Sequence, residues 1–339
     1  MTPSRYIAEP SSLDAQPIVV LRDDTGRCVR IACHGAALVS FEVPRGGRAF
    51  DIAAGYRDAA EIAARPGSRF AIMAPFAGRI ADARYRFDGR DYDLQPGAAP
   101  EKRESRHGFV RDADFAVTEL VAEASSARAA LSTPVRMLPG WPFAIDFSVR
   151  FVLDSTGLTL EARMRNSGDR AAPCFFGWHP YLRVNDGAAN DWLLEIPARA
   201  LIRAGTDLIA LPGDAAYVPL DDAPALDFRR ARLVAASILD QGYADLTAAA
   251  DGRIRTRLMD PASRFGVTVW QDRGVMHAFT GDTLKRDVRR SIALEPMECM
   301  ANAFNRPEWS DAIRLEPGKE RLFRCGIEPT SELAPCESK

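Results

Sequence analysis

A β-hairpin is encoded in residues 145–164, which read IDFSVRFVLDSTGLTLEARM. Apolar side chains occupy every second position from Ile145 to Leu153, and most positions between them are polar or charged. The alternation returns from Leu158 to Met164, after a turn-forming segment at residues 154–157. Successive side chains of a strand point to opposite faces of a sheet, so this period of two indicates two antiparallel strands with one buried and one solvated face.

The same alternation extends over most of the chain. A second hairpin is predicted at residues 85–94, where Asp88-Gly89 supplies the turn. Helical periodicity is limited to one or two turns at residues 58–64, and the 24 Gly and 23 Pro residues are spread between short segments as turn formers. Further strands are predicted at residues 18–22, 28–33, 37–43, 115–122, 127–131, 253–259, 266–271, 276–280 and 291–295.

These elements predict an all-β protein built as a large antiparallel β-sandwich. The chain has neither a repeat of fixed period nor a low-complexity linker, so residues 17–330 are assigned to a single domain. Residues 1–16 are polar and contain proline, and they are assigned to an N-terminal extension. Residues 331–339 are assigned to a C-terminal tail.

Composition and charge limit the classes of molecule that this protein is expected to bind. The chain has 339 residues, 47 % apolar and 27 % charged, with a net charge of −2 and scattered basic residues, which argues against nucleic-acid binding. It shows no secretory signal and no apolar run near the roughly 20 residues that span a bilayer. We therefore expect a cytoplasmic protein without membrane contact, either a monomer or a homodimer. The six cysteines are far apart without C-x-x-C spacing, so no metal site is expected.

Three titratable residues stand out by their local settings. His107 lies in the Gly-containing connection RHGFVRD, His179 lies among aromatics in FFGWHPYL, and Glu295 ends an apolar strand before a proline. A carboxyl at an apolar strand end tends to have a raised pKa, which suits a general base. Each residue also has a structural interpretation: a solvated loop histidine, a core histidine and a solvated strand-end acid. His34 and His277 lie in apolar strand settings and are expected to be structural.

Four short motifs follow one another along the chain: FAGRI at residues 76–80, HGF at 107–109, GWHPY at 177–181 and LEP at 294–296. In this order they resemble the aldose 1-epimerases, the galactose mutarotase family, over about residues 17–330. The resemblance implies a galactose mutarotase-like supersandwich, in agreement with the period-two pattern. It also implies an isomerase that interconverts the α and β anomers of an aldohexose such as galactose or glucose.

Carried onto this sequence, the resemblance makes Glu295 the general base and His179 the general acid. It implies that His107 binds the sugar near the ring oxygen and shares the acid role, and that Arg79 binds a hydroxyl. Asp245 is the best match to the family's substrate-binding aspartate. Ring opening transfers protons without net oxidation or reduction, so no cofactor is expected and a small-molecule sugar is the expected partner. We expect the two histidines, Glu295 and Arg79 to converge on one open cleft, with Glu295 across a sugar-sized gap from a histidine.

Other functions stay open at this point. The segment KRDVRR at residues 285–290 reads as a solvated loop, but folded over the site it could hold a sugar phosphate, so a hexose-6-phosphate mutarotase is one alternative. A non-catalytic carbohydrate-binding protein on the same fold is another. A lyase or a glycosidase, the latter with Glu298 partnering Glu295, is a third. Gly78 stands where the family commonly has Asn, which leaves the identity of the sugar open.

Overall fold

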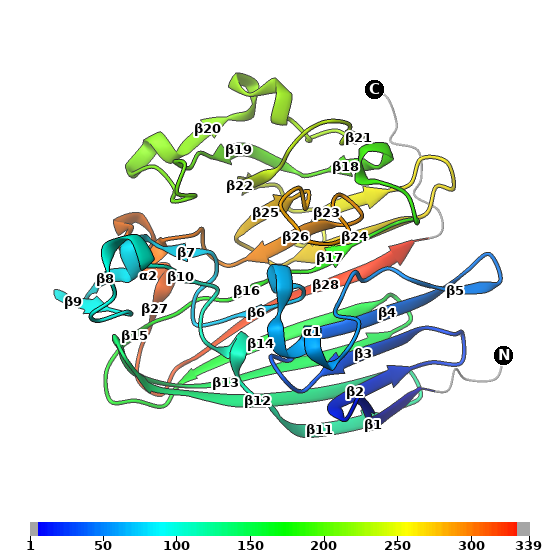
Figure 1. Ribbon diagram of the computed structural model, residues 1–339, viewed down its shortest axis with the longest axis horizontal. Helices are drawn as coiled ribbons and strands as arrows, with labels where there is room; N and C mark the ends of the chain where they lie inside the picture. Colours follow the sequence, from blue (N-terminus) through cyan, green and yellow to red (C-terminus); the bar gives the residue numbers. More distant parts are fainter. Residues whose placement is uncertain (1–5, 331–339) are drawn as a thin grey trace.

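Antiparallel strands make up most of the chain in the computed structural model, which describes residues 6–330 (Figure 1). The prediction of an all-β antiparallel fold is confirmed. The largest sheet has nine strands, in the order β11 (Ala116–Ala122), β12 (Ser126–Leu138), β13 (Trp141–Asp154), β14 (Leu158–Asn166), β28 (Glu320–Thr330), β24 (Gly266–Gln271), β23 (Ile254–Met259), β18 (Leu193–Glu195) and β21 (Arg232–Leu233).

A second sheet carries the cavity described below. Its order is β20 (Tyr217–Pro219), β19 (Ala198–Ile202), β22 (Asp240–Leu246), β25 (Val275–Phe279), β26 (Ile292–Met297), β16 (Gly177–Trp178) and β6 (Ile72–Met73), and β17 (Tyr181–Leu182) also pairs with β26.

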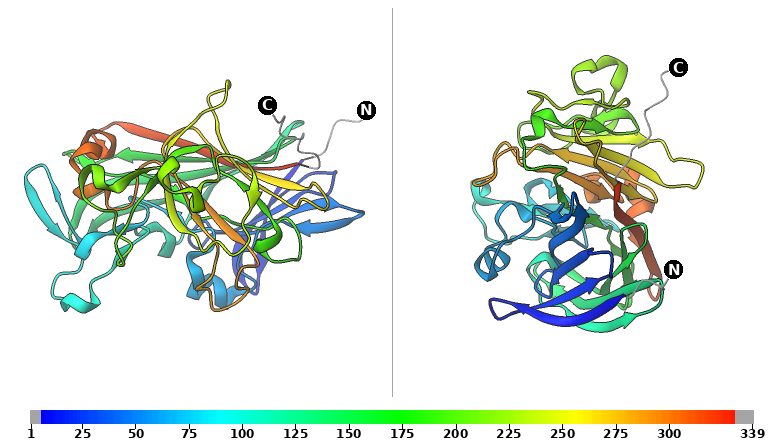
Figure 2. Two further views of the ribbon diagram at one scale, coloured as in Figure 1. Left: turned by 90° about the horizontal axis from the view of Figure 1, so that it is seen from above. Right: turned by 90° about the vertical axis from the view of Figure 1, so that its right-hand side faces the viewer.

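A third sheet and three strand pairs complete the fold. The third sheet runs β1 (Ile7–Leu13), β2 (Gln16–Arg22), β3 (Cys28–Ala32), β4 (Leu38–Arg45) and β5 (Arg48–Asp51). Figures 1 and 2 show β1–β5 at one end of the molecule and β18–β22 at the other. The pairs are β7 (Arg79–Ile80) with β10 (Ser105–Arg106), β8 (Arg84–Phe87) with β9 (Arg90–Asp93), and β15 (Ala172–Pro173) with β27 (Arg314–Leu315).

The hairpin of residues 145–164 forms as its sequence predicts. Burial alternates along β13 at every second residue, and Phe147 pairs with Met164 of β14 on the buried face. The Asp154 carboxylate closes the turn by accepting hydrogen bonds from the backbone N–H groups of Thr156 at 2.7 Å and Gly157 at 3.3 Å. The second predicted hairpin is β8–β9, with Tyr85 opposite Tyr92.

The two ends of the chain bear on the predicted domain boundaries. Residues 7–13, assigned to an extension, form β1 and pair with β2 over its whole length, with Pro10 opposite Val19. Because β1 is an edge strand, it tolerates a proline and polar side chains that would not suit a central strand. The predicted tail at residues 331–339 lies outside the described residues.

Helices are short and few in residues 6–330. The predicted turn at residues 58–64 is α1 (Ala59–Ala64), whose N-cap Asp58 accepts a hydrogen bond from the Glu61 N–H at 2.8 Å. The second α-helix is α2 (Ser310–Ile313). No helix in the described part of the chain is long and apolar enough to cross a membrane.

Candidate active site

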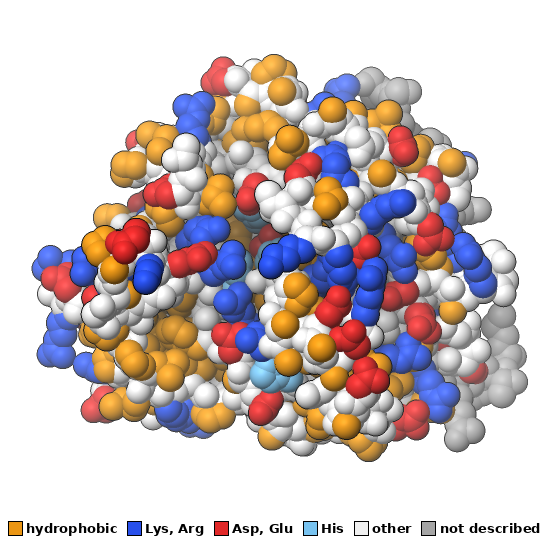
Figure 3. Space-filling model, viewed as in Figure 1, with side chains coloured by type: hydrophobic (Ala, Val, Ile, Leu, Met, Phe, Trp, Pro, Cys, Tyr) orange, Lys and Arg blue, Asp and Glu red, His pale blue; other side chains and the backbone are white. Residues whose placement is uncertain are grey.

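An open cavity of about 780 Å³ lies over the strands β22, β25 and β26. Loops at residues 64–69, 106–112 and 283–286 form much of its wall. Figure 3 shows a hollow near the centre of this face, with histidine side chains inside it and Lys and Arg side chains on both sides. All of the predicted site residues except Asp245 line this cavity.

Strand register places the polar residues of the floor in one row. His277 on β25 is directly opposite Glu295 on β26 and Gly242 on β22. Strands β16 and β17 pair with β26 on either side of His179, which places His179 beside Glu295. Directly opposed residues of antiparallel strands project from the same face, and so does Asp240, two residues before Gly242.

The centre of the row is a direct contact between His179 and Glu295. Their Nε2 and Oε1 atoms are 3.3 Å apart, and both side chains are buried, at 8 % and 5 % exposure. The imidazole stacks on the ring of Tyr181 at a centroid distance of 4.9 Å, and the Tyr181 hydroxyl donates a hydrogen bond to the Gly67 carbonyl at 2.9 Å. No sugar-sized gap separates Glu295 from His179, because the cross-strand register brings these two groups into contact.

Burial sets the protonation of this pair. It raises the pKa of Glu295 to about 8, although the charge of His277 opposes the shift. Burial lowers the pKa of His179 to about 3, and the charge of His277 acts in the same direction. Taking a group out of water disfavours its charged form, so the carboxyl and the imidazole are both driven towards neutrality. The pair therefore holds a single proton over a wide range of pH.

His107 reaches the same place from a loop. Its backbone has φ of 60°, and its N–H donates a hydrogen bond to the Gly78 carbonyl at 2.8 Å. Gly108 is required next to it, because a Cβ there would lie 2.0 Å from the carbonyl oxygen of Ala74. The imidazole meets that of His179 edge to face at 5.4 Å. The Nδ1 atoms of both histidines are buried without a hydrogen-bond partner, and burial holds the pKa of His107 well below its usual range.

A family model described as Aldose 1-epimerase matches residues 17–328. The chain belongs to the aldose 1-epimerase family. It is therefore an isomerase, and the resemblance read from the four motifs is confirmed.

Known relatives of this family member cover most of its length. The uncharacterized protein YihR of Escherichia coli (strain K12) is 30 % identical over 254 residues, which are 74 % of this chain and 76 % of that protein. The GalM/aldose epimerase homologue from C. elegans has a similar fold, with a TM-score of 0.79, 17 % identity and coverage of 91 % of this chain and 97 % of that one. Galactose 1-epimerase from Lactobacillus acidophilus NCFM gives a TM-score of 0.78 at 13 % identity, covering 97 % and 99 %.

Asp240 lies where Asp245 was expected. Asp245 is exposed on β22 and is not among the residues that line the cavity, whereas Asp240, at the start of the same strand, is. The backbone of Asp245 has φ of 52°, so the regular alternation of β22 does not extend through it, and of these two aspartates only Asp240 lines the cavity. The structure therefore brings Asp240, and not the predicted Asp245, to the other site residues.

His277 also departs from its expected structural role, because it lines the cavity. Its Nε2 atom is 2.8 Å from Oδ1 of Asp240. Burial alone would lower the pKa of His277, but the hydrogen bond with Asp240 and the charge of Glu295 outweigh it and raise the pKa. The same hydrogen bond lowers the pKa of Asp240, so an ion pair stands beside the Glu295 carboxyl. His34, in contrast, hydrogen-bonds Asp114 at 2.7 Å away from this cavity.

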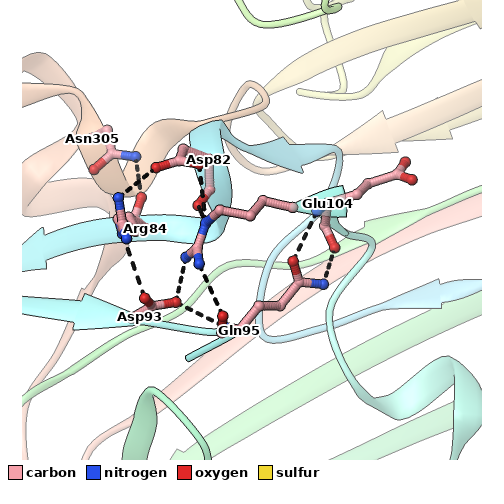
Figure 4. A network of polar contacts seen from close by, with 7 residues as sticks. Asp82, Arg84, Asp93, Gln95, Glu104 and Asn305 are labelled. Atoms are coloured by element: carbon pink, nitrogen blue, oxygen red, sulfur yellow. Dashed lines mark hydrogen bonds and ion pairs between the residues drawn. The ribbon is translucent and has the colours of Figure 1, made fainter. Parts of the chain in front are cut away.

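Arg79 lines the cavity and is held by its neighbour Glu104, with Nη1 and Oε1 2.5 Å apart. Glu104 is fixed in turn by Gln95, whose side-chain amide exchanges two hydrogen bonds with the Glu104 backbone (Figure 4). The network continues from β9 to β8 through the ion pair between Asp93 and Arg84. This network around β8 and β9 therefore holds the Arg79 guanidinium at the rim of the site.

Glu298 lies outside the cavity lining. Its Oε2 atom accepts a hydrogen bond from the Phe176 N–H at 2.8 Å, and its Oε1 atom pairs with Arg273 at 2.5 Å. The two facing carboxylates of a glycosidase are therefore not formed by Glu295 and Glu298. Within residues 6–330, no group of three or more His, Cys, Asp or Glu side chains is arranged to hold a metal ion.

Proposed function

We propose that this isomerase is an aldose mutarotase, which interconverts the α and β anomers of an aldohexose such as galactose or glucose. The observation that supports it most directly is the contact of 3.3 Å between His179 and Glu295 at the floor of an open cavity. A donor and an acceptor of protons stand side by side there, with one proton between them.

This arrangement suits the two oxygens that react. The anomeric hydroxyl O1 and the ring oxygen O5 are both bonded to C1, so they lie closer together than two hydrogen-bonded atoms do. An acid and a base in contact can therefore address both oxygens of one sugar from the cavity side. Two groups separated by a sugar ring would instead address different ends of the substrate.

The proposed reaction starts when the proton that the pair shares moves from Glu295 to His179, which leaves Glu295 ionised. The Glu295 carboxylate takes the proton of O1 while His179 gives its proton to O5, and the C1–O5 bond breaks as the C1–O1 bond becomes a carbonyl. Rotation about the C1–C2 bond then turns the other face of the aldehyde towards O5. Reversal of the two proton transfers closes the ring as the other anomer, so no atom or electron is lost.

The remaining residues support binding in this proposal. His107, against the edge of His179, holds the sugar near O5 and shares the acid role, and Arg79 binds a hydroxyl. Asp240 and His277 take the place proposed at first for Asp245, because their ion pair lies on the same face as Glu295. A non-catalytic sugar-binding protein would not require the paired acid and base.

Replacing the base tests the proposal. Glu295→Gln keeps the shape of the side chain but cannot accept the O1 proton, so kcat for anomer exchange should fall by about 10²–10⁴. NMR exchange spectroscopy on an equilibrated aldose measures kcat, and calorimetry measures sugar affinity, which should change little. Asp245→Asn, outside the cavity, is the matched control and should behave as the wild type. Retention of most activity by Glu295→Gln would refute the assignment of the base.

A further inference from the structure

The wall of the cavity carries more positive than negative side chains. Seven Lys or Arg residues line it against three carboxylic acids, and one of those acids is Glu295, whose pKa of about 8 keeps it largely neutral at pH 7. Figure 3 shows the positive side chains on both sides of the hollow. A neutral aldose has no group that requires such a charge.

Four of these seven positive side chains are already neutralised by nearby acids. Arg65 pairs with Asp112 at 2.6 Å. Glu104 pairs with Arg79 at 2.5 Å and with Arg106 at 3.3 Å. Arg286 is held by both carboxylate oxygens of the Glu61 side chain, at 2.7 Å and 2.6 Å. These four arginines have structural partners, so part of their charge is not available to a ligand.

Three of the positive side chains have no comparably close acidic partner: Lys285, Arg69 and Arg111. Among residues 6–330, no carboxylate lies within ion-pair distance of Lys285 or Arg69. Arg111 is 3.7 Å from Asp112, which is already bound more closely by Arg65. Lys285 is exposed at the rim of the cavity, on the loop between β25 and β26.

Two guanidinium nitrogens are also buried without a hydrogen-bond acceptor. They are Nη2 of Arg69 and Nε of Arg111, and the Arg69 side chain as a whole is 1 % exposed. Burial lowers the pKa of Arg69, and the neighbouring charge of Arg286 adds to the effect. Burial lowers the pKa of Arg111 too; the charge of Asp112 opposes this shift, and the charges of Arg106 and Arg65 add to it. Unpaired buried charge is costly, and a bound anion would remove part of that cost.

We propose that the sugar taken by this site carries an oxyanion, which Lys285 and Arg111 bind at the wall of the cavity while Glu295 and His179 act on C1. The inference rests on the proposed mutarotase function and names its substrate class. Phosphate, sulfate, sulfonate and carboxylate groups share the relevant chemistry, since each offers negative oxygens to an ammonium and a planar guanidinium. Arg69, which lies over the ring of Tyr181 at 4.9 Å, adds positive charge behind this wall.

The test compares neutral and anionic aldoses on the same enzyme. Anomer exchange is measured by NMR for glucose, glucose 6-phosphate, the 6-deoxy-6-sulfonate of glucose and glucuronate. We expect kcat/KM to be at least tenfold higher for one or more of the anionic sugars than for glucose. The ranking of the three anions distinguishes a phosphate, a sulfonate and a carboxylate as the group that is recognised.

A single substitution then tests the residue. Lys285→Gln removes an exposed charge with no partner in the described part of the chain, so the fold should tolerate it. It should raise KM for the preferred anionic sugar by about tenfold, because a charge-assisted hydrogen bond is lost, and leave kcat and the values for glucose unchanged. Lys319→Gln removes the same charge outside the cavity and should change neither sugar's KM.

Each outcome has one meaning. Equal kcat/KM for glucose and all three anions overturns the inference and leaves the mutarotase proposal standing. An equal effect of Lys285→Gln on glucose and on the anionic sugar also overturns it. Tight binding of an anionic sugar without exchange of any aldose supports the anion site and refutes the mutarotase proposal.

Discussion

Raising the pH above 8 is predicted to remove the proton that Glu295 and His179 share. Burial raises the pKa of Glu295 to about 8 and lowers that of His179 to about 3, so between these values the pair holds one proton. The reaction needs one group that can donate a proton and one group that can accept a proton. The proton can move between the two groups without any change in their total, so kcat/KM should be nearly flat from about pH 4 to pH 7.

The size of the effect follows from the pKa of Glu295. Once the carboxyl ionises with His179 neutral, the pair has a base but no acid, and the active fraction falls tenfold for each pH unit. Relative to the plateau, kcat/KM should be about a tenth at pH 9 and about a hundredth at pH 10. A solvated carboxylate and imidazole would give the opposite assignment, with the carboxylate on the acidic limb and the imidazole on the falling limb.

Polarimetry on a freshly dissolved α-anomer measures the rate, with the spontaneous exchange at each pH subtracted. The residual activity of Glu295→Gln serves as the control, because the limb near pH 8 should disappear when the carboxyl is removed. A wild-type kcat/KM that rises tenfold per unit from pH 6 to pH 8 would refute the shared proton and show that the ionised carboxylate alone limits the rate.

Three further predictions follow from the site and its supports. Asp240→Asn should lower the pKa of His277, measured by NMR titration, and reduce kcat/KM by about tenfold because a charge is lost. Asp245→Asn should leave both quantities unchanged, and equal effects of the two variants would contradict the placement of the two aspartates. Gly108→Ala should lower both Tm and activity, because its Cβ would lie 2.0 Å from a backbone oxygen. Gly89→Ala, in an open turn with φ of 74°, should lower the free energy of unfolding by only about 1 kcal/mol. A similar Tm for both variants would contradict the close approach at Gly108. Dialysis against a chelator should leave kcat unchanged, since the proton transfers need no metal, and activity that is lost and then restored by a divalent ion would contradict this.

The sheets could be predicted from sequence because their signal is local. Alternation along β13 and β14 shows directly which side chains are buried, and the turn between them has its own chemistry. The sequence does not predict β1, because an edge strand has no strict burial pattern and its Ser and Pro residues resemble a loop. The order of strands in the sheets has no such local signal.

Strand register explains what the sequence could not show about the site. The apolar strand VMHAF indicates a structural role for His277, and nothing nearby in the sequence reveals that this residue lies opposite Glu295. Asp240 lies five residues from the aspartate chosen by family resemblance, and only the pairing of β22 with β25 decides which one faces the cavity. Tracing alternation through β25 and β26 together gives the missing signal, but it requires knowing that these strands are neighbours.

The position of β28 between β14 and β24 bears on how the chain is made. Until residues 320–330 leave the ribosome, the nine-stranded sheet exists as two unconnected pieces. At about 5–20 residues per second, the roughly 150 residues after β14 take about 8–30 s to synthesise, and β14 has an open edge throughout. Its outward-facing Glu161, Arg163 and Arg165 place a charged side chain at every second position of that strand, which discourages pairing between nascent chains on neighbouring ribosomes.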